Sequence, residues 1–249
     1  MGLTIHYDLH APHLKTAIEA RKLLASLRKF AKSLPFKDVT KILTWKKGKD
    51  DPILEEHFSH ILWKEIPGQE TQYYWAKPLE LAFFSVHQPG AESAIFGLAR
   101  YSKTATSAEG SKIPSNLPGW NWRRFCKTQY ASMSAEGGWP NFFTIHDGIC
   151  QILDQAAALG LRTKVLDESK YFEHRDPGRL EKEIFRWNTM IAAVVGAFKD
   201  RSARTKTPLH APILATPEFE HLEAKGQHFL EQAPQIEVIR NPKPRHKRK

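Results

Sequence analysis

The chain has 249 residues, of which 41% are hydrophobic and 26% charged, and its formal net charge is +10. This composition is typical of a water-soluble globular protein and excludes a disordered chain. No apolar run approaches the ~20 residues of a membrane-spanning helix, and 1–7 lacks the basic and apolar regions of a signal peptide. Two cysteines, Cys126 and Cys150, exclude a disulfide framework, so we expect a soluble, cytoplasmic protein without membrane partners.

Hydrophobic patterns predict the secondary structure of the first hundred residues. A helical stripe predicts a helix over 14–34, which Pro35 ends. The pair Asp51-Pro52 is a favourable helix start and predicts a short helix over 52–64. Strand-like patterns cover five segments, namely 3–9, 39–46, 71–76, 79–87 and 93–101.

The second half of the chain alternates between loops and strong helical patterns. Residues 102–119 are rich in Ser, Thr, Gly and Pro, which predicts a surface loop and a candidate internal boundary. Helices are predicted over 140–159 and 177–198, with a strand over 162–167 between them. Beyond residue 200 the periodicity is lost.

The order of these elements predicts an α+β fold. Strand–helix–strand, further strands, and then helix–strand–helix is compatible with a ferredoxin-like βαββαβ core that carries an insertion and an extended C-terminal segment. We therefore expect one domain over 1–200, an extension over 201–237 that wraps the body, and a disordered basic tail over 238–249.

The most unusual stretch is the basic–aromatic segment, which we define as 120–130. Guanidinium groups pair with phosphate and flat rings stack on bases, so this composition is typical of a site for single-stranded nucleic acid or a nucleotide. The alternative is a partly buried strand or loop whose basic side chains lie along aromatic surface. The candidate binding residues are Trp120, Trp122, Arg123, Arg124, Lys127 and Tyr130.

The C-terminal tail carries much of the positive charge. Its six cations leave a net charge of only +4 on residues 1–237, since the whole chain carries +10. Such a tail attracts any polyanion, and the attraction weakens as salt rises. The alternative is a tail that only confers solubility. The six cations are Arg240, Lys243, Arg245, Lys247, Arg248 and Lys249.

Part of the chain resembles a family of uncharacterised bacterial proteins. The resemblance is carried by Phe125–Ser132 and extends through Gly137-Gly138, His146 and the region 165–175. It implies a bacterial, cytoplasmic origin. It implies no mechanism, because no activity is associated with that family.

Cys126 and His146 are candidates for nucleophilic catalysis. The neighbouring cations Arg124 and Lys127 would lower the pKa of the Cys126 thiol if they lie close to it. His146 is the nearest histidine in the sequence that could act as a base. The alternative is a buried, structural cysteine.

Carboxylates at the end of the predicted strand 162–167 are candidates for acid–base chemistry. Asp167 and Glu168 lie where α/β proteins often place such groups, and carboxylate oxygens there could hold Mg²⁺. The alternative is that these are solvated loop charges, as Asp176 is accounted for by a helix cap.

Metal binding is also suggested by His6, Asp8 and His10. Residues at i, i+2 and i+4 of a strand share one face, which could chelate a metal, but no established ligand spacing covers them, so no metal is assigned. The chain has no Walker A, G-x-G-x-x-G, H-E-x-x-H or G-x-S-x-G motif. The standard forms of nucleotide triphosphatase, dinucleotide-dependent dehydrogenase, zincin and α/β-hydrolase are therefore excluded.

Two main hypotheses follow from these residues. The first is a basic protein that binds single-stranded nucleic acid, or another polyanion, through the basic–aromatic segment and the tail. The second is an enzyme for an anionic small substrate, with Lys127, His146 and Asp167 around one cleft. A protein-interaction scaffold with exposed aromatic residues is a third reading.

Overall fold

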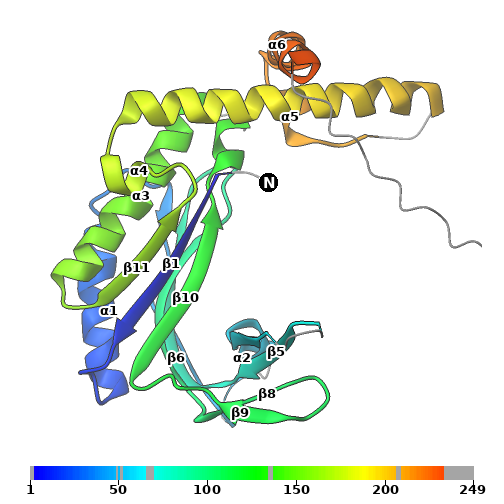
Figure 1. Cartoon of the computed structure of the whole chain (residues 1–249). Helices are drawn as coiled ribbons and strands as arrows, with labels where there is room; N and C mark the ends of the chain where they lie inside the picture. The colour runs from blue at the N-terminus through cyan, green and yellow to red at the C-terminus, as the bar shows by residue number, and fades with distance from the viewer. Residues whose placement is uncertain are drawn as a thin grey trace, which may run out of the picture.

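The computed structural model describes residues 3–48, 50, 53–65, 70–133, 137–205 and 209–232, and contains both helices and antiparallel sheets. This confirms the predicted α+β class. The larger sheet has seven strands in the order β11-β1-β10-β7-β6-β2, with β3 also paired to β6 (Figure 1). Its strands are β1 (Thr4–Ala11), β2 (Asp38–Val39), β3 (Leu43–Lys46), β6 (Pro78–His87), β7 (Ala94–Tyr101), β10 (Trp120–Lys127) and β11 (Arg162–Asp167).

A smaller sheet lies near the lower end of the larger one in Figure 1. It has four strands in the order β4-β5-β8-β9. Exposed apolar side chains share one of its faces, because Ile61 lies opposite Trp75 and Trp63 opposite Tyr73. Its strands are β4 (His60–Lys64), β5 (Gln72–Ala76), β8 (Thr104–Thr106) and β9 (Lys112–Pro114).

Two helices, α1 (Ala17–Ala31) and α3 (Gly138–Ala158), cover one face of the larger sheet (Figure 1). The helix α1 begins with a capping box, in which Thr16 accepts a hydrogen bond from the Glu19 backbone and the Glu19 carboxylate accepts one from the Thr16 backbone. Both helices bury one apolar stripe against the sheet, as the helical periodicity predicts, and this leaves the opposite face of the sheet for other contacts.

The segment 52–64 is helical only in its first half, so that prediction is corrected. A short helix, α2 (Ile53–His57), is followed directly by β4. The reason lies in tertiary contacts. Phe58 is buried against Phe83 and Trp122, and the following residues gain cross-strand partners in β5 that a helix would forfeit.

The predicted loop 102–119 also contains regular structure. Strands β8 and β9 pair as a hairpin within it, and its turn includes Gly110, whose φ of 86° is readily adopted by glycine. The strand predicted over 39–46 is divided into β2 and β3, which pair with different parts of β6.

The C-terminal part of the described chain is helical. The long helix α5 (Pro177–Thr205) packs against η2 (Pro212–Ala215) and α6 (Phe219–Gln232), and it meets α4 (Tyr171–His174) and η1 (Gln129–Met133) near the sheet. Hydrophobic packing against α5 orders residues that show no clear sequence periodicity. The extension predicted over 201–237 thus forms helices on α5 where the structure describes it.

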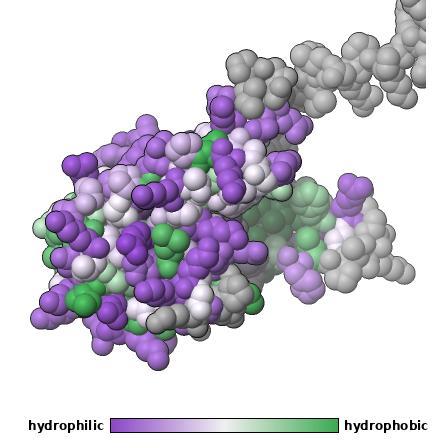
Figure 2. All heavy atoms as spheres, turned by 90° about the horizontal axis from the view of Figure 1, so that it is seen from below, coloured by the Kyte–Doolittle hydropathy of each residue, from purple (hydrophilic) through white to green (hydrophobic). Residues whose placement is uncertain are grey.

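The helix α5 projects beyond the sheets in Figure 1, and Figure 2 shows hydrophobic areas on a mostly hydrophilic surface viewed from below. Phe185, Val194 and Phe198 of α5 are exposed. Among the described residues, no helix combines the length and hydrophobicity needed to cross a bilayer. The tail 238–249 and its six predicted contact residues lie outside the described residues.

Candidate functional site

Strands β1 and β10 bring two distant segments of the sequence side by side. Their antiparallel register sets Asp8 opposite Arg123 and His6 opposite Phe125. Directly opposed residues of an antiparallel pair lie on the same face of a sheet. All four side chains are at least partly exposed, so this face is accessible from solvent.

Two of the three cations of the basic–aromatic segment have carboxylate partners. Arg123 donates to Asp8 in a bidentate pair, with Nε–Oδ1 and Nη2–Oδ2 distances of 2.8 and 3.1 Å. The Lys127 ammonium lies 3.8 Å from a carboxylate oxygen of Glu92. These partners offset the charge that each cation could offer to a ligand.

Arg124 differs, because it makes no ion pair within the described part of the chain. Its guanidinium donates to the carbonyl of His57 at 2.9 Å, and it lies over the rings of Phe58 and Trp122 at 4.6 and 5.2 Å. Burial lowers the pKa of Arg124. Aromatic rings attract a cation but do not neutralise it, so Arg124 is a half-buried charge that a negative ligand would complement.

A cavity of about 400 Å³ opens beside Arg124, between the larger sheet and β4, and we call it the sheet pocket. A pocket of this size can hold a small ligand or one unit of a polymer. Its ionisable lining is dominated by three cations against one carboxylate, and it therefore favours an anion. These residues are Arg123, Arg124, Lys164 and Asp8.

Two further polar side chains line the sheet pocket and are nearly buried. His60 and Tyr101 are only 7% and 6% exposed, and their rings meet edge to face at 5.4 Å. Burial and the charge of Arg123 lower the pKa of His60 to about 4, and burial raises the pKa of Tyr101 to about 12. Both side chains are therefore neutral at neutral pH and can act as hydrogen-bonding groups.

Neither group is satisfied by the described residues. The Nδ1 atom of His60 is buried without a hydrogen-bond partner, and the Tyr101 hydroxyl makes no hydrogen bond to this part of the chain. Buried polar groups usually have partners, because an unmade hydrogen bond costs about 1–3 kcal/mol. Both side chains line the sheet pocket, where a ligand could bond to their accessible polar atoms.

The rim of the sheet pocket is hydrophobic. It offers flat or branched surfaces on which the ring of a ligand can rest. Aromatic side chains stack on any nucleobase, since every base has a π-face. The rim residues are Ile61, Trp63, Phe125 and Leu166, all of which are exposed.

A second hollow of about 280 Å³ adjoins the sheet pocket and shares His6 and Phe125 with it. We call the two together the groove. The second hollow is also lined by Lys127, Tyr130 and Glu168. The groove thus collects the exposed half of the basic–aromatic segment along the face formed by β1, β10 and β11.

Trp120 and Trp122 do not belong to this surface. Both are only 1% exposed, and the Trp122 indole donates to the carbonyl of Ile95 at 2.9 Å. Their rings therefore fill the core and are closed to a ligand in this structure. This corrects their expected place among the binding residues, and it agrees with the alternative that basic side chains cover buried aromatic surface.

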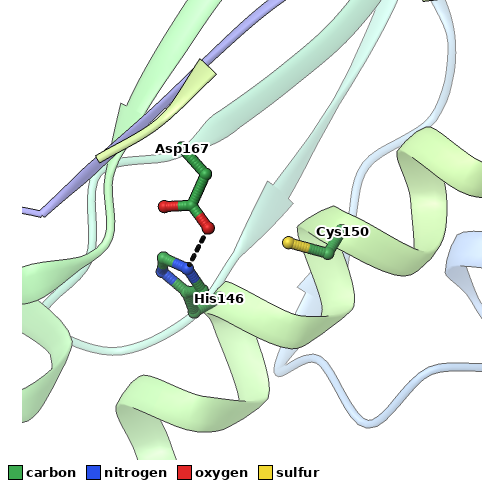
Figure 3. Close-up of side chains that lie close together, drawn as sticks. All are labelled: His146, Cys150 and Asp167. Atoms are coloured by element: carbon green, nitrogen blue, oxygen red, sulfur yellow. Dashed lines mark hydrogen bonds and ion pairs between the residues drawn. The ribbon is translucent and has the colours of Figure 1, made fainter. Parts of the chain in front are cut away.

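His146 and Asp167 meet in a fully buried cluster (Figure 3). The Nε2 atom of His146 lies 3.1 Å from Asp167, and its Nδ1 atom lies 2.8 Å from the Thr128 hydroxyl. Ser169 donates to Asp167 from its hydroxyl and its backbone N–H. Burial raises the pKa of Asp167, but the hydrogen bonds and His146 outweigh it and hold this pKa at about 2.

This cluster joins three elements and is closed to a substrate in this structure. It connects the end of β10, the helix α3 and the end of β11, and the His146 side chain is 0% exposed. Lys127 instead lines the groove, so Lys127, His146 and Asp167 do not surround one cleft. That spatial requirement of the enzyme hypothesis is not met.

The other catalytic candidates are also separated. Cys126 is buried, its thiol donates to the carbonyl of Glu92, and burial raises its pKa, which is opposite to the expected activation. Glu168 accepts a hydrogen bond from the backbone of Thr4 and lies 3.8 Å from His6 at the edge of the groove.

The predicted metal ligands of β1 have other partners. Asp8 pairs with Arg123, and His10 is hydrogen-bonded to the carbonyl of Pro118 at 3.0 Å. Within the described residues, the group whose atoms approach closely enough for a metal is His146, Cys150 and Asp167. Hydrogen bonds already occupy the His146 and Asp167 atoms, so the cluster is explained as a structural network.

No protein-family model, curated protein or solved structure matches this chain.

Sequence reasoning missed several residues of the sheet pocket, among them His60, Trp63 and Tyr101. His60 and Trp63 fell in a predicted helix, and Tyr101 at the end of a predicted strand carried no motif. The sequence does contain a signal that could have identified this strand. Ile61 and Trp63 are two residues apart, a spacing that places both side chains on one face of a strand.

Proposed function

We propose that the protein binds single-stranded nucleic acid in the groove. The observation that carries this proposal is Arg124, a half-buried guanidinium without a carboxylate partner among the described residues, beside a pocket with exposed aromatic residues. A phosphate would supply the missing negative charge, and charge-assisted hydrogen bonds to phosphate are among the stronger contacts that proteins make.

The exposed rings favour a nucleic acid over a simple anion. Phe125, Trp63 and Tyr130 are accessible, and stacking of one base on such a ring contributes about 1–3 kcal/mol. A duplex hides the faces of its bases, whereas a single strand presents them. Single-stranded RNA or DNA therefore fits the groove better than a duplex or an acidic protein.

We also propose that the fold core is the ferredoxin-like βαββαβ arrangement. The elements β1, α1, β7, β10, α3 and β11 follow that order along the chain, and the strands lie in the order β11-β1-β10-β7. RNA-recognition domains stack bases on aromatic residues of a four-stranded sheet. That parallel is one of fold and supports the proposal only by analogy.

The tail extends the proposal to sequence-independent contacts. Its cations, from Arg240 to Lys249, add attraction to the phosphate backbone of a strand already held in the groove. The groove would set which strands bind, and the tail would raise the affinity for all of them.

The test is fluorescence anisotropy of a labelled 12-nucleotide single strand with the full chain and with Arg124→Gln. We expect the variant to bind about tenfold more weakly or worse, because a hydrogen bond to a charged group contributes about 1.5–3 kcal/mol. Arg100→Gln is the matched control, since Arg100 is paired with Glu80 outside the groove.

Circular dichroism of each variant separates lost binding from lost folding. Equal affinity of Arg124→Gln and the unaltered chain would contradict the proposal. Tighter binding to heparin than to any single strand would show a general polyanion surface in place of a nucleic-acid site.

A further inference from the structure

The sheet pocket is polar at its bottom and hydrophobic at its rim. His60 and Tyr101 are almost buried, whereas Trp63 and Phe125 are 57% and 49% exposed. A ligand that fills the pocket therefore carries its polar group at its inner end and its ring at the outer end.

The donor groups of the pocket favour an anion with several acceptor oxygens. The Tyr101 hydroxyl and the Arg124 guanidinium are donors, and the His60 ring can donate through Nε2 in the tautomer that carries its proton there, since its Nδ1 atom is buried. The charge of Arg124 acts on the pKa of both His60 and Tyr101, as expected of neighbours in one site. These donors line one pocket and suit the three terminal oxygens of a phosphate monoester.

An internal phosphodiester fits this shape poorly. It is flanked by a sugar on each side, so both sugars would have to approach a bottom whose residues are more than nine-tenths buried. A terminal phosphate has only one nucleoside behind it, and that base reaches the rim formed by Trp63 and Phe125. The pocket volume of about 400 Å³ suits one nucleotide and excludes a longer stretch of strand.

We infer that the sheet pocket binds the phosphorylated end of a nucleic-acid strand, with the terminal phosphate at His60, Tyr101 and Arg124 and the terminal base at the rim. This inference rests on the proposed function, because it assumes that the rest of the strand follows the terminal nucleotide along the groove.

The experiment compares three 10-nucleotide strands of one sequence, with a 5′-phosphate, a 3′-phosphate or hydroxyls at both ends, by competition anisotropy with the full chain. We expect one phosphorylated strand to bind about tenfold more tightly than the hydroxyl strand, since each charge-assisted hydrogen bond adds affinity. Tyr101→Phe removes a single hydroxyl and should reduce this preference. Tyr73→Phe, at an exposed tyrosine outside the groove, should retain it.

The outcomes separate this inference from the proposed function. Equal affinity for all three strands would overturn the inference and leave the proposed function standing. If no strand binds but thymidine monophosphate does, the polymer proposal fails and the phosphate subsite holds. If inorganic phosphate competes as well as the mononucleotide, the rim contributes nothing and the inference of a terminal nucleotide is wrong.

Discussion

At the scale of single residues, Asp167 carries a negative charge although it is only 1% exposed. Hydrogen bonds from His146, Ser169 and the Phe172 backbone keep its pKa at about 2, below the value of about 4 of an unfolded chain. A depressed pKa in the folded state means that the carboxylate stabilises the fold when ionised. This contribution is complete above about pH 5 and is lost as the pH falls toward 2.

We therefore expect Asp167→Asn to lower the free energy of unfolding by about 2–3 kcal/mol at pH 7, following the size of the pKa shift. The difference between the variant and the unaltered chain should shrink as the pH falls from 5 to 2. Urea unfolding followed by circular dichroism measures both. Glu181→Gln is the control, because Glu181 is exposed on α5.

The same measurement tests whether the cluster is structural. A variant as stable as the unaltered chain at every pH would show that the network does not support the fold. The buried cluster would then need another role.

Phe125 is the residue whose loss should affect binding with least effect on folding. It is 49% exposed, so its truncation removes little core packing. We expect Phe125→Ala to weaken single-strand binding by about five- to a hundredfold, as the loss of one stacked base implies. Anisotropy titration measures the change.

Phe198→Ala is the matched control, because Phe198 is similarly exposed but lies on α5, outside the groove. If both substitutions have the same effect, hydrophobic contact in general explains binding, and stacking in the groove does not.

At the scale of elements, β7 and β10 pack closely against each other at Gly97. A Cβ atom there would approach the Trp122 ring to 2.7 Å and the Phe83 Cβ atom to 2.8 Å. The absence of a side chain at this point lets the large indole of β10 enter the core beside β6 and β7.

We expect Gly97→Ala to destabilise the protein by about 1–3 kcal/mol, the usual effect of overpacking a core. Gly178→Ala, in the first turn of α5, meets nothing closer than 3.5 Å and should leave stability unchanged or raise it. Thermal denaturation of both variants provides the comparison, and equal melting temperatures would contradict the packing of Trp122.

Sequence patterns predicted those elements whose burial is periodic. The helices α1 and α3 and the strands β1, β6, β7 and β11 were anticipated, because local propensity and tertiary packing agree there. The strand β4 was not anticipated, because the favourable helix start at 51–52 masks its pairing with the next strand, β5.

The candidate site was only half predictable. The composition of β10 pointed to Arg123, Arg124 and Lys127 as contact residues. It could not show that Trp122 is buried or that Asp8 pairs with Arg123, because both follow from the register of distant strands. The place of Tyr101 and His60 in the sheet pocket could not be predicted either, because it depends on tertiary packing.

At the scale of the whole molecule, the tail and the groove should contribute differently to binding. Truncation after Ile239 removes six cations and leaves the groove intact. We expect the slope of log affinity against log salt to flatten by as much as about 4, at about 0.7 per phosphate contact on a single strand. The effect of Phe125→Ala should be the same in the truncated and full chains. Anisotropy titrations at four salt concentrations measure both quantities, and an unchanged slope would show that the tail does not touch the strand.

The central claim is that the groove holds a single strand, and photo-cross-linking locates that strand most directly. A strand with photoreactive bases is irradiated with the full chain, and the linked peptides are identified by mass spectrometry. We predict cross-links in β4 and β10, at Trp63 and Phe125 above all. Cross-links confined to α5, α6 or the residues after 232 would contradict the account.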